Sequence, residues 1–503
     1  MKTNTLDFDA QALRDKILDL AMRGKLVPQD PNDEPASVLL EKIKAEKAEL
    51  VKEKKIKKSK PLPEITDDEK PFDIPDSWEW VRLGEVGNYI QRGRSPKYDK
   101  KNKSHPIISQ KCVQWENIYL KDAKYITKTF FDKLEDYRFV QENDVLWNST
   151  GTGTVGRLNI VKQNLDHIPV DSHVTLIRMN KQVNPDYIYY YLRSPEIQDN
   201  LNDYLTGTTK QKELGLTNIL KVKIPLPPLS EQSRIAAKIA QLFALLRKVE
   251  TSTQQYAKLQ TLLKSKVLDL AMRGKLVKQD PNDEPASVLL EKIKAEKAEI
   301  VKEKKIKKSK PLPPITDEEK PFDIPDSWEW VRLGNIVSYQ NGYAYKSSEL
   351  VKIRKGLPVI KSQNIMTLKV IIKDNNDYVK EPNEKMLNSK IIKGDLLMCL
   401  SSQSKNPEPL GKTAIYDLDK PALLNQRVLK LKLINHSMTD LIYYFINSSW
   451  FHFTVSHRGS GSGQSNLKLG DVMNMPIPVP PLNEEKHIVN RIEILFTPIV
   501  KSN

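Results

Sequence analysis

Amide, hydroxyl and basic side chains gather in short polar segments of this chain, between stretches rich in aliphatic and β-branched residues. Such side chains form the forked hydrogen bonds that read base edges, and lysine and arginine also neutralise phosphates. The candidates in the first half are Arg92, Arg94, Lys97, Ser109, Gln110, Lys111, Asn148, Thr150, Lys210, Gln211 and Lys212. Those in the second half are Lys361, Ser362, Gln363, Asn364, Ser401, Gln403, Lys405, Arg458, Gln464 and Asn466. Each fits an ordinary exposed loop residue as well as a DNA contact.

Motifs of catalysis are missing. Gly411-Lys412-Thr413 resembles the end of a phosphate-binding loop, but Asn406 stands where the first glycine of that loop belongs. Pro227-Pro228 is flanked by leucines and lacks the aromatic residue that amino-methyltransferases place after such a pair. The seven histidines are scattered, and Asp76 with Glu79 is explained more simply by a turn that enters a strand. We therefore predict no catalytic residue, no metal site and no cofactor bound by this chain.

The segment that must position these candidates occurs twice in the sequence. Residues 16–84 return at 266–334 with a fixed offset of 250, and only five of the 69 positions differ. The stretches that follow the two copies match only in outline. Repeats of this length exceed a solenoid unit, so we predict a duplicated domain with internal pseudo-two-fold symmetry. A near-identical frame with two different inserts suggests one docking surface used twice and two recognition surfaces that differ.

A long helix is predicted from Leu229 to about Arg273, with Gly274 as its stop. It follows a Pro-Pro-Leu hinge at 227–229, which is echoed at 480–482 before a shorter helix. No proline or glycine interrupts the pattern, and the heptad-like spacing predicts a coiled coil. The apolar residues that carry this spacing are Ile235, Ile239, Leu242, Leu246, Val249, Tyr256, Leu259 and Leu263.

A second helix is predicted over about 286–308, after a polar breaker loop, and it would pack back on the first as an antiparallel hairpin. The same second half recurs near the N-terminus, as helices over 13–27 and 36–58. The stretch over 482–496 would supply the missing first half. If the two termini pair, the chain closes in a circular arrangement in which two helical hairpins alternate with two globular inserts.

Each insert is predicted to be a strand-rich globular domain, which makes the fold class α+β. Strands are expected at 144–147, 173–177 and 221–224 in the first insert, and at 395–398 and 427–431 in the second. One aromatic helix, over 187–192 or 441–446, is expected in each core. Trp78 and Trp80, like Trp328 and Trp330, alternate as strand residues do. We expect them to anchor the start of each core rather than to stack on bases.

The composition of the 503 residues allows several packed cores, since 39% are hydrophobic. No apolar run approaches the roughly 18 residues that a membrane span needs. The N-terminus lacks the apolar stretch of a secretory signal. The two cysteines, Cys112 and Cys399, fall in different inserts. We therefore expect a reducing, cytoplasmic setting.

The formal net charge of +16 suggests a polyanionic partner. Segments 41–60 and 291–310 each hold nine Lys and four Glu, so ten of the sixteen excess charges lie in the duplicated frame. A single helix of this kind is more often a solvated face. Repeated beside two variable inserts, it suggests an electrostatic footprint for nucleic acid or for a nucleic-acid-binding partner.

Several motifs, taken in order, resemble the specificity subunits of type I restriction-modification enzymes. They are the Leu-Pro-Pro-Leu-Ser-Glu-Gln run at 226–232, the Gly-Asp-Leu-Leu strand at 394–397, and the Ala-Met-Arg-Gly-Lys-Leu-Val segment at 21–27 and 271–277. A glycine-bearing polar turn before a proline-rich exit, at 207–212 and 461–466, completes the resemblance. Asn143 replaces the glycine of the strand motif in the first insert. The resemblance covers nearly the whole chain.

The resemblance implies a non-catalytic subunit with two target-recognition domains, each reading one half of a split DNA site. It divides the chain into an N-terminal helical region (1–60), a first recognition domain (61–228), a central coiled coil (229–310), a second recognition domain (311–481) and a C-terminal helix (482–503). The implied partners are double-stranded DNA, two methyltransferase subunits and restriction subunits. S-adenosylmethionine, ATP and Mg would bind those partner subunits.

The geometry of the central helix agrees with that implication. A helix of about 45 residues spans roughly 70 Å, which is close to two turns of B-DNA. The alternative is a coiled-coil scaffold that binds proteins without DNA specificity. That alternative explains the helices but gives no purpose to two dissimilar, polar-lined inserts.

Overall fold

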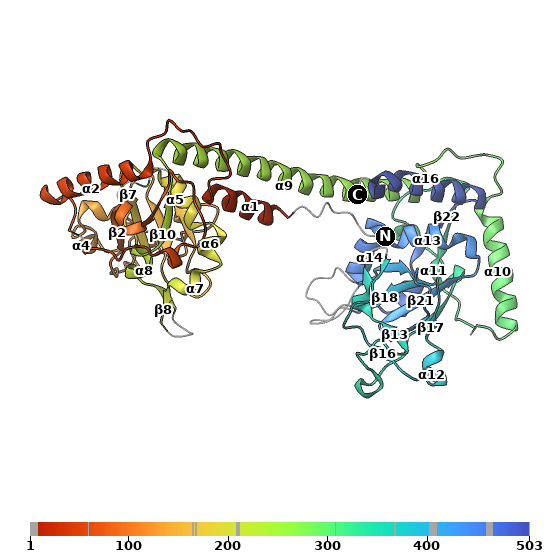
Figure 1. The fold of residues 1–503 in the computed structure, drawn as a ribbon. Helices are drawn as coiled ribbons and strands as arrows, with labels where there is room; N and C mark the ends of the chain where they lie inside the picture. Colours follow the sequence, from red (N-terminus) through yellow and green to blue (C-terminus); the bar gives the residue numbers. More distant parts are fainter. Residues whose placement is uncertain are drawn as a thin grey trace. The chain divides into compact units, whose positions relative to one another are not determined.

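The computed structural model describes residues 9–58, 60–162, 165, 168–207, 212–306, 308–366, 369–401, 410–458 and 466–501. The chain divides into two compact units (Figure 1). The N-terminal unit covers Phe8–Thr253, and the C-terminal unit consists mainly of Gln254–Asn503. Each unit therefore contains one copy of the frame and one insert.

The N-terminal unit alternates short strands with short helices. Its elements are α1 (Ala10–Met22), α2 (Ala36–Lys52), β1 (Glu79–Arg82), α3 (Leu83–Val86), β2 (Gly87–Arg92), β3 (Pro106–Ile107), β4 (Lys124–Tyr125), α4 (Lys128–Phe131), β5 (Val145–Asn148), β6 (Leu158–Ile160), β7 (Val174–Met179), α5 (Pro185–Leu192), α6 (Pro195–Gln198), α7 (Leu201–Tyr204), β8 (Leu205–Thr206), β9 (Glu213–Leu214), α8 (Leu216–Leu220), β10 (Lys223–Leu226) and the start of α9 (Leu229–Met272).

The C-terminal unit takes the end of α9 and repeats the same order with more strands. Its further elements are α10 (Ala286–Lys302), β11 (Glu329–Arg332), α11 (Leu333–Ile336), β12 (Val337–Asn341), β13 (Leu357–Ile360), β14 (Ile365–Met366), β15 (Lys369–Val370), β16 (Tyr378–Val379), α12 (Glu384–Leu387), β17 (Lys390–Ile391), β18 (Leu396–Cys399), β19 (Thr413–Ile415), β20 (Ala422–Leu424), β21 (Val428–Leu433), α13 (Thr439–Ile446), α14 (Ser449–Arg458), α15 (Leu469–Met473), β22 (Pro476–Val479) and α16 (Leu482–Lys501).

The same antiparallel sheet lies at the centre of each insert. Its strand order is β2-β7-β5-β6 in the N-terminal unit and β12-β21-β18-β19 in the C-terminal unit. The insert is closed at its base by one antiparallel pair, β1 with β10 or β11 with β22. A second four-stranded sheet, β16-β13-β20-β17, occurs in the C-terminal unit. The predicted repeat is therefore confirmed in the topology of the two units, although the inserts differ in their periphery.

Both faces of the central sheet are buried, because successive side chains of a strand point to opposite faces. In β5, Val145 and Trp147 face a core that also holds residues of α1, α5 and α9, whereas Leu146 faces a second cluster. The aromatic helices, observed as α5 and α13, bury Tyr187, Tyr191, Phe445 and other apolar residues as predicted. One core thus contains residues of both the frame and the insert. The division of the chain into five regions stays a prediction, and this core includes residues from more than one of those regions.

The helices end where the sequence changes chemistry. α9 stops at Met272, and Gly274 follows with a φ of +66°, a left-handed conformation that suits glycine. The amide of Lys275 then donates to the carbonyl of Leu270 and satisfies one of the last carbonyls of the helix. α2 and α10 each begin after a proline and end about six residues before the predicted boundary.

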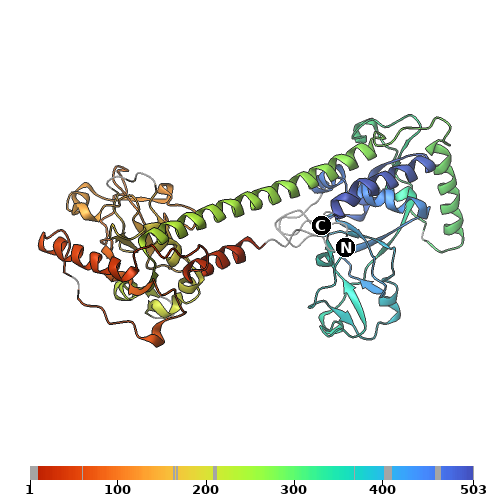
Figure 2. The same ribbon diagram turned by 45° about the horizontal axis from the view of Figure 1, so that its top comes forward.

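The predicted coiled-coil hairpins are not confirmed. In Figures 1 and 2, α10 leaves the end of α9 at a steep angle instead of running back along it. Its buried Leu289 and Ile293 belong to the core that includes Trp328 at the start of the insert. Val249 and Leu259 of the heptad-like stripe are 44% and 62% exposed. A pairing of the chain termini would lie between the two units, and it stays a prediction.

Candidate DNA-recognition edges

One edge of the central sheet collects the candidate residues of the N-terminal unit. β2 and β5 end at this edge and the antiparallel β7 begins there, so the residues after Arg92, after Asn148 and before Val174 become neighbours. A parallel bridge joins Arg94 to Asp171. The amide of Leu214 donates to the carbonyl of Ser149, which brings β9 to the same place. We call this set of loops the N-terminal recognition edge.

Asn148 is structural rather than a reader. It is fully buried, and its Nδ2 donates to the carbonyls of Gln110 (3.0 Å) and Val113 (3.4 Å). These bonds fix the loop that carries Ser109, which is also buried. Gln110 is half-buried and accepts a hydrogen bond at Oε1 from the Thr150 hydroxyl (3.4 Å). Asn148 therefore holds Gln110 and Thr150 in position.

The basic candidates of this edge differ in their exposure and in how many hydrogen bonds and ion pairs they form within the protein. Arg92 donates to the Leu214 carbonyl (2.6 Å) and to Glu213 (3.2 Å), which leaves it a positioning role. Arg94 is 45% exposed and pairs with Glu135 at 2.8 Å. Lys212 donates to Asn202 at 3.0 Å, and both Lys97 and Lys111 are exposed.

The C-terminal unit builds the matching edge from equivalent strands. β12 and β18 end there, and β21 begins there. Tyr343 bridges Asn425 as Arg94 bridges Asp171. The amide of Asn425 donates to the Ile360 carbonyl, so residues 361–364 follow directly, and Ser401 bridges Asn466. These loops form the C-terminal recognition edge.

The fold again divides this second set into positioning and exposed residues. Asn364 is fully buried and donates from Nδ2 to the Ile371 carbonyl and to Asn376, both at 2.8 Å. Lys361 forms an ion pair with Asp377, and Ser401 is buried. Gln363 and Asn466 are exposed, and Ser362 is half-buried. The sequence candidates Lys210, Gln211, Gln403, Lys405 and Gln464, and the side chain of Arg458, lie outside the residues that the structure describes.

The two edges share one backbone plan but differ in side chains at six equivalent positions. The amide of Ser149 donates to the carbonyl of His173, and the amide of Leu400 donates to the carbonyl of Arg427 in the same way. Ser149 is therefore equivalent to Leu400, and His173 to Arg427. The pairs are Arg94 and Tyr343, Gln110 and Ser362, Lys111 and Gln363, Thr150 and Ser401, Asp171 and Asn425, and His173 and Arg427. Equivalent backbones thus carry different side chains, of which Asp171 and Ser401 are buried.

His173 and Arg427 were missed from the sequence. His173 is 45% exposed, and its Nδ1 lies 3.4 Å from the buried Asp171 carboxylate. Burial raises the pKa of Asp171, and the bonds from His173 offset part of that rise. Their positions could have pointed to them. Each residue directly precedes a strand, and that strand pairs antiparallel with a strand that ends in a candidate loop, so the two segments meet at the same edge.

A duplicated hydrogen-bond network attaches each insert to its frame. Trp78 Nε1 donates to Glu231 (2.9 Å), and Gln29 Nε2 donates to the second oxygen of the same carboxylate (2.5 Å). The C-terminal unit repeats this with Trp328, Gln279 and Glu484. Burial raises the pKa of Glu231 and of Glu484, and the donors offset part of the rise. Trp78 and Trp328 are therefore core anchors, as predicted, whereas Trp80 and Trp330 are only half-buried.

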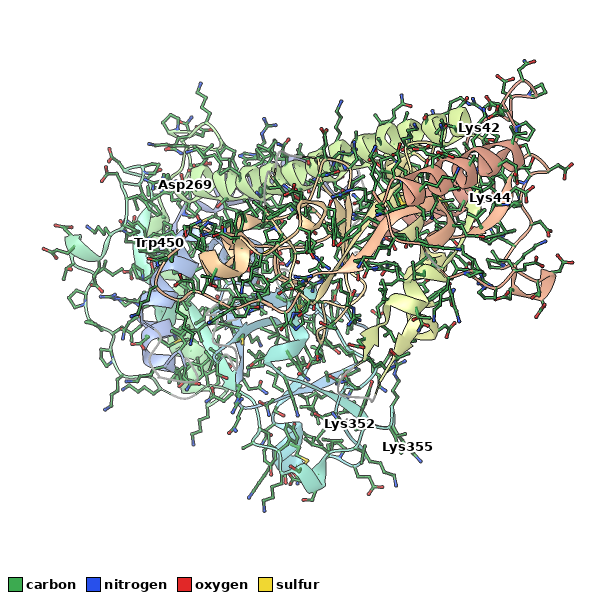
Figure 3. The ribbon with its side chains drawn as sticks, turned by 90° about the vertical axis from the view of Figure 1, so that its left-hand side faces the viewer. Lys42, Lys44, Asp269, Lys352, Lys355 and Trp450 are labelled. Carbon is green, nitrogen blue, oxygen red and sulfur yellow. The ribbon has the colours of Figure 1, made fainter. Side chains whose placement is uncertain are left out.

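The lysine-rich helix of the frame is exposed. Lys42 and Lys44 extend from α2 (Figure 3), and they pair with Glu34 and Glu41 at 2.6 and 3.2 Å. Exposed pairs of this kind contribute little to stability, about 0–1 kcal/mol. α2 itself holds four Lys and three Glu, so most of the excess positive charge of segment 41–60 lies just after the helix, where Lys54, Lys55, Lys57 and Lys58 are exposed.

Neither cysteine shows the properties of a nucleophile. Cys112 and Cys399 are buried, and burial raises the pKa of both thiols. Among the described residues, there is no group of three or more His, Cys, Asp or Glu side chains that could hold a metal ion. The same part of the chain contains no helix that is both long and apolar enough to span a membrane.

Comparison with known proteins connects these edges to a family. The model of the type I restriction modification DNA specificity domain matches residues 75–260 and 325–502. The EcoAI specificity subunit of Escherichia coli is 34% identical over 97% of this chain and 89% of its own length, and the E. coli EcoEI specificity subunit is 30% identical over the same shares.

The fold is likewise similar to a chain of a solved type I R-M system, at 20% identity. The TM-score is 0.53, with 86% of this chain and 93% of that chain covered. Two matched domains, one in each unit, and two relatives aligned along nearly their whole length agree with the duplicated edges. The chain belongs to the family of type I restriction-modification specificity subunits.

Proposed function

We propose that this chain is the non-catalytic subunit that selects a split DNA site for a type I restriction-modification complex. Each recognition edge reads one half of the site by direct contacts with base edges. The single observation that carries the proposal is the pair of equivalent edges with different side chains at six positions. A protein scaffold with two identical partners has no use for such a difference.

The near-identical frame supports docking of the same partner twice. Methyltransferase subunits, which would bind S-adenosylmethionine, occupy the two frames, and restriction subunits that use ATP and Mg join the same cytoplasmic complex. The exposed apolar residues of α9, among them Leu259 and Leu262, and the exposed lysines of α2 and α10 are available for that docking. The chain itself contributes recognition and assembly.

The test is N6-methyladenine mapping in cells that carry the cognate methyltransferase, with and without this chain. We expect a two-part motif with a fixed gap that appears only when the chain is present. An active methyltransferase that shows no chain-dependent motif would instead favour the protein-only scaffold.

A matched pair of variants sharpens the test, because Lys111 and Gln363 occupy equivalent exposed positions. Lys111→Ala is expected to relax or weaken methylation at one half of the motif, and Gln363→Ala at the other half. Equal loss at both halves in either variant contradicts the assignment of one edge to one half. Gln464→Ala, a sequence-based prediction for the second half alone, extends the series.

A further inference from the structure

A cavity of about 310 Å³ lies in the N-terminal unit, and none of the residues that line it is a candidate of the recognition edge. The end of α1 supplies Asp19 and Arg23, the link before β1 supplies Phe72, and α6 with its flanking residues supplies Ser194, Glu196 and Asp199. A volume of this size is within the range of small-molecule sites, roughly 300–1,000 Å³. Nothing in the recognition of DNA by the sheet edge uses this cavity.

The carboxylates of the cavity outnumber its cations. Asp19 is already paired with Arg23 at 2.6 Å, and the Arg23 guanidinium lies 4.5 Å from the centre of the Phe72 ring. Glu196 is half-buried, and its carboxylate forms no hydrogen bond or ion pair with a described residue. Asp199 adds a further carboxylate at the exposed rim. The cavity therefore has a surplus of negative charge.

A second, independent feature is an unsatisfied hydroxyl. Ser194 lines the cavity and is 1% exposed, yet its Oγ has no hydrogen-bond partner among the described residues. A buried polar atom without a partner costs roughly 1–3 kcal/mol, so such atoms are rare in folded proteins. A ligand with an N–H group would provide the missing partner.

The C-terminal unit fills the equivalent space with its own side chain. Ser194 and Ser448 are equivalent, since each amide donates at 2.9 Å to the carbonyl three residues before it, in α5 or α13. Trp450 therefore stands where the N-terminal unit has Glu196. Its ring packs on Phe322, the counterpart of Phe72, with 6.2 Å between centroids. Arg273, which pairs with Asp269 at 2.9 Å, lies 4.6 Å from the centre of the same Phe322 ring, as Arg23 does with Asp19 and Phe72. The frame residues of the two units are the same here, but the insert residues differ at more than one position, since the offset that relates Ser194 to Ser448 places Phe453 where the N-terminal unit has Asp199.

We propose that this cavity binds a small organic cation, an alkyl chain that ends in a guanidinium or ammonium group. The cation pairs with Glu196 and Asp199, donates to Ser194 Oγ, and lays its methylene groups against Met22 and Phe72. We expect no such site in the C-terminal unit, because Trp450 occupies the position of Glu196 and packs on Phe322. The inference does not depend on the proposed reading of DNA.

The test is isothermal titration calorimetry of the full chain with agmatine, which carries both cationic groups on a four-carbon stem. One saturable site per chain is expected. Glu196→Gln, which keeps the shape and removes the charge, should weaken binding about tenfold or more, since a charge-assisted hydrogen bond is lost. Glu196→Trp, which copies the other unit, should abolish binding.

The opposite exchange supplies the matched control. Trp450→Glu combined with Phe453→Asp, which restores the counterparts of Glu196 and Asp199, should open a second cavity and raise the stoichiometry from one site to two. The proposal is overturned if the wild-type chain shows no saturable binding at millimolar agmatine, or if Glu196→Gln binds as tightly as the wild type. Because Glu196→Gln is nearly isosteric, the result stands even if Glu196→Trp fails to fold.

Discussion

Glu485 predicts an unusual dependence of stability on pH. It lies in the first turn of α16, is 1% exposed, and its Oε2 has no hydrogen-bond partner among the described residues. Burial, reinforced by the charge of Asp440 and opposed by Lys486, raises the pKa of Glu485 to about 7. The N-terminal unit has Gln232 at this position, where Nε2 donates to the Pro227 carbonyl (2.8 Å) and Oε1 accepts from the Asn184 amide (2.8 Å).

The sign and size of the effect follow from linkage. Between the unfolded pKa of about 4.5 and the folded pKa of about 7, the unfolded chain releases a proton that the folded chain keeps. Stability therefore falls as pH rises through this window, and the penalty is complete above it. A pKa that rises from about 4.5 to about 7 corresponds to at most about 3.5 kcal/mol.

Glu485→Gln should remove this penalty. We expect the variant to be more stable than the wild type by about 1–3 kcal/mol at pH 8 and nearly equal to it at pH 4.5. Thermal and urea unfolding of the full chain at several pH values measures the difference. The matched control, Gln232→Glu, should create a similar penalty in the N-terminal unit. A stabilisation by Glu485→Gln that is independent of pH, or a loss of stability at pH 8, would refute the reasoning.

Three further perturbations test the packing of the recognition units. Trp78→Phe removes a hydrogen bond to the buried Glu231 and should cost about 1–3 kcal/mol in urea unfolding, with Trp328→Phe giving a similar loss through Glu484. Asp144 is 1% exposed and accepts hydrogen bonds from Arg178 at 2.9 and 2.7 Å. Arg178→Met leaves this buried carboxylate without its charge partner and should lower the free energy of unfolding by about 3–5 kcal/mol at neutral pH. The loss should be smaller at a pH at which Asp144 is protonated. Gly93→Ala places a Cβ 1.9 Å from the Val170 carbonyl oxygen, so it should disturb the N-terminal recognition edge and impair methylation at one half of the motif. Gly342→Ala places a Cβ 2.1 Å from the Asn425 carbonyl oxygen and should impair methylation at the other half.

The local elements followed from the sequence because their signals are local. α9 was predicted to within about one residue at each end, since a proline pair precedes it and Gly274 ends it. The strands β5, β7, β18 and β21 were placed within one or two residues, because β-branched and aliphatic runs mark buried strands. α2 and α10 were predicted too long, since their lysine-rich ends have high helix propensity but no apolar face to bury.

The sequence by itself determined that this chain is a repeat of one frame with two different inserts, because identity at a fixed offset requires no structure. It also placed polar loops at the ends of the predicted strands. Only the tertiary structure decided which polar residues are buried supports and which stay exposed. Asn148 and Asn364 have the same side chain as an exposed candidate such as Asn466, yet both are fully buried. Burial depends on which strands become neighbours, and antiparallel pairing brings together residues such as Arg94 and Asp171 that are far apart in the chain.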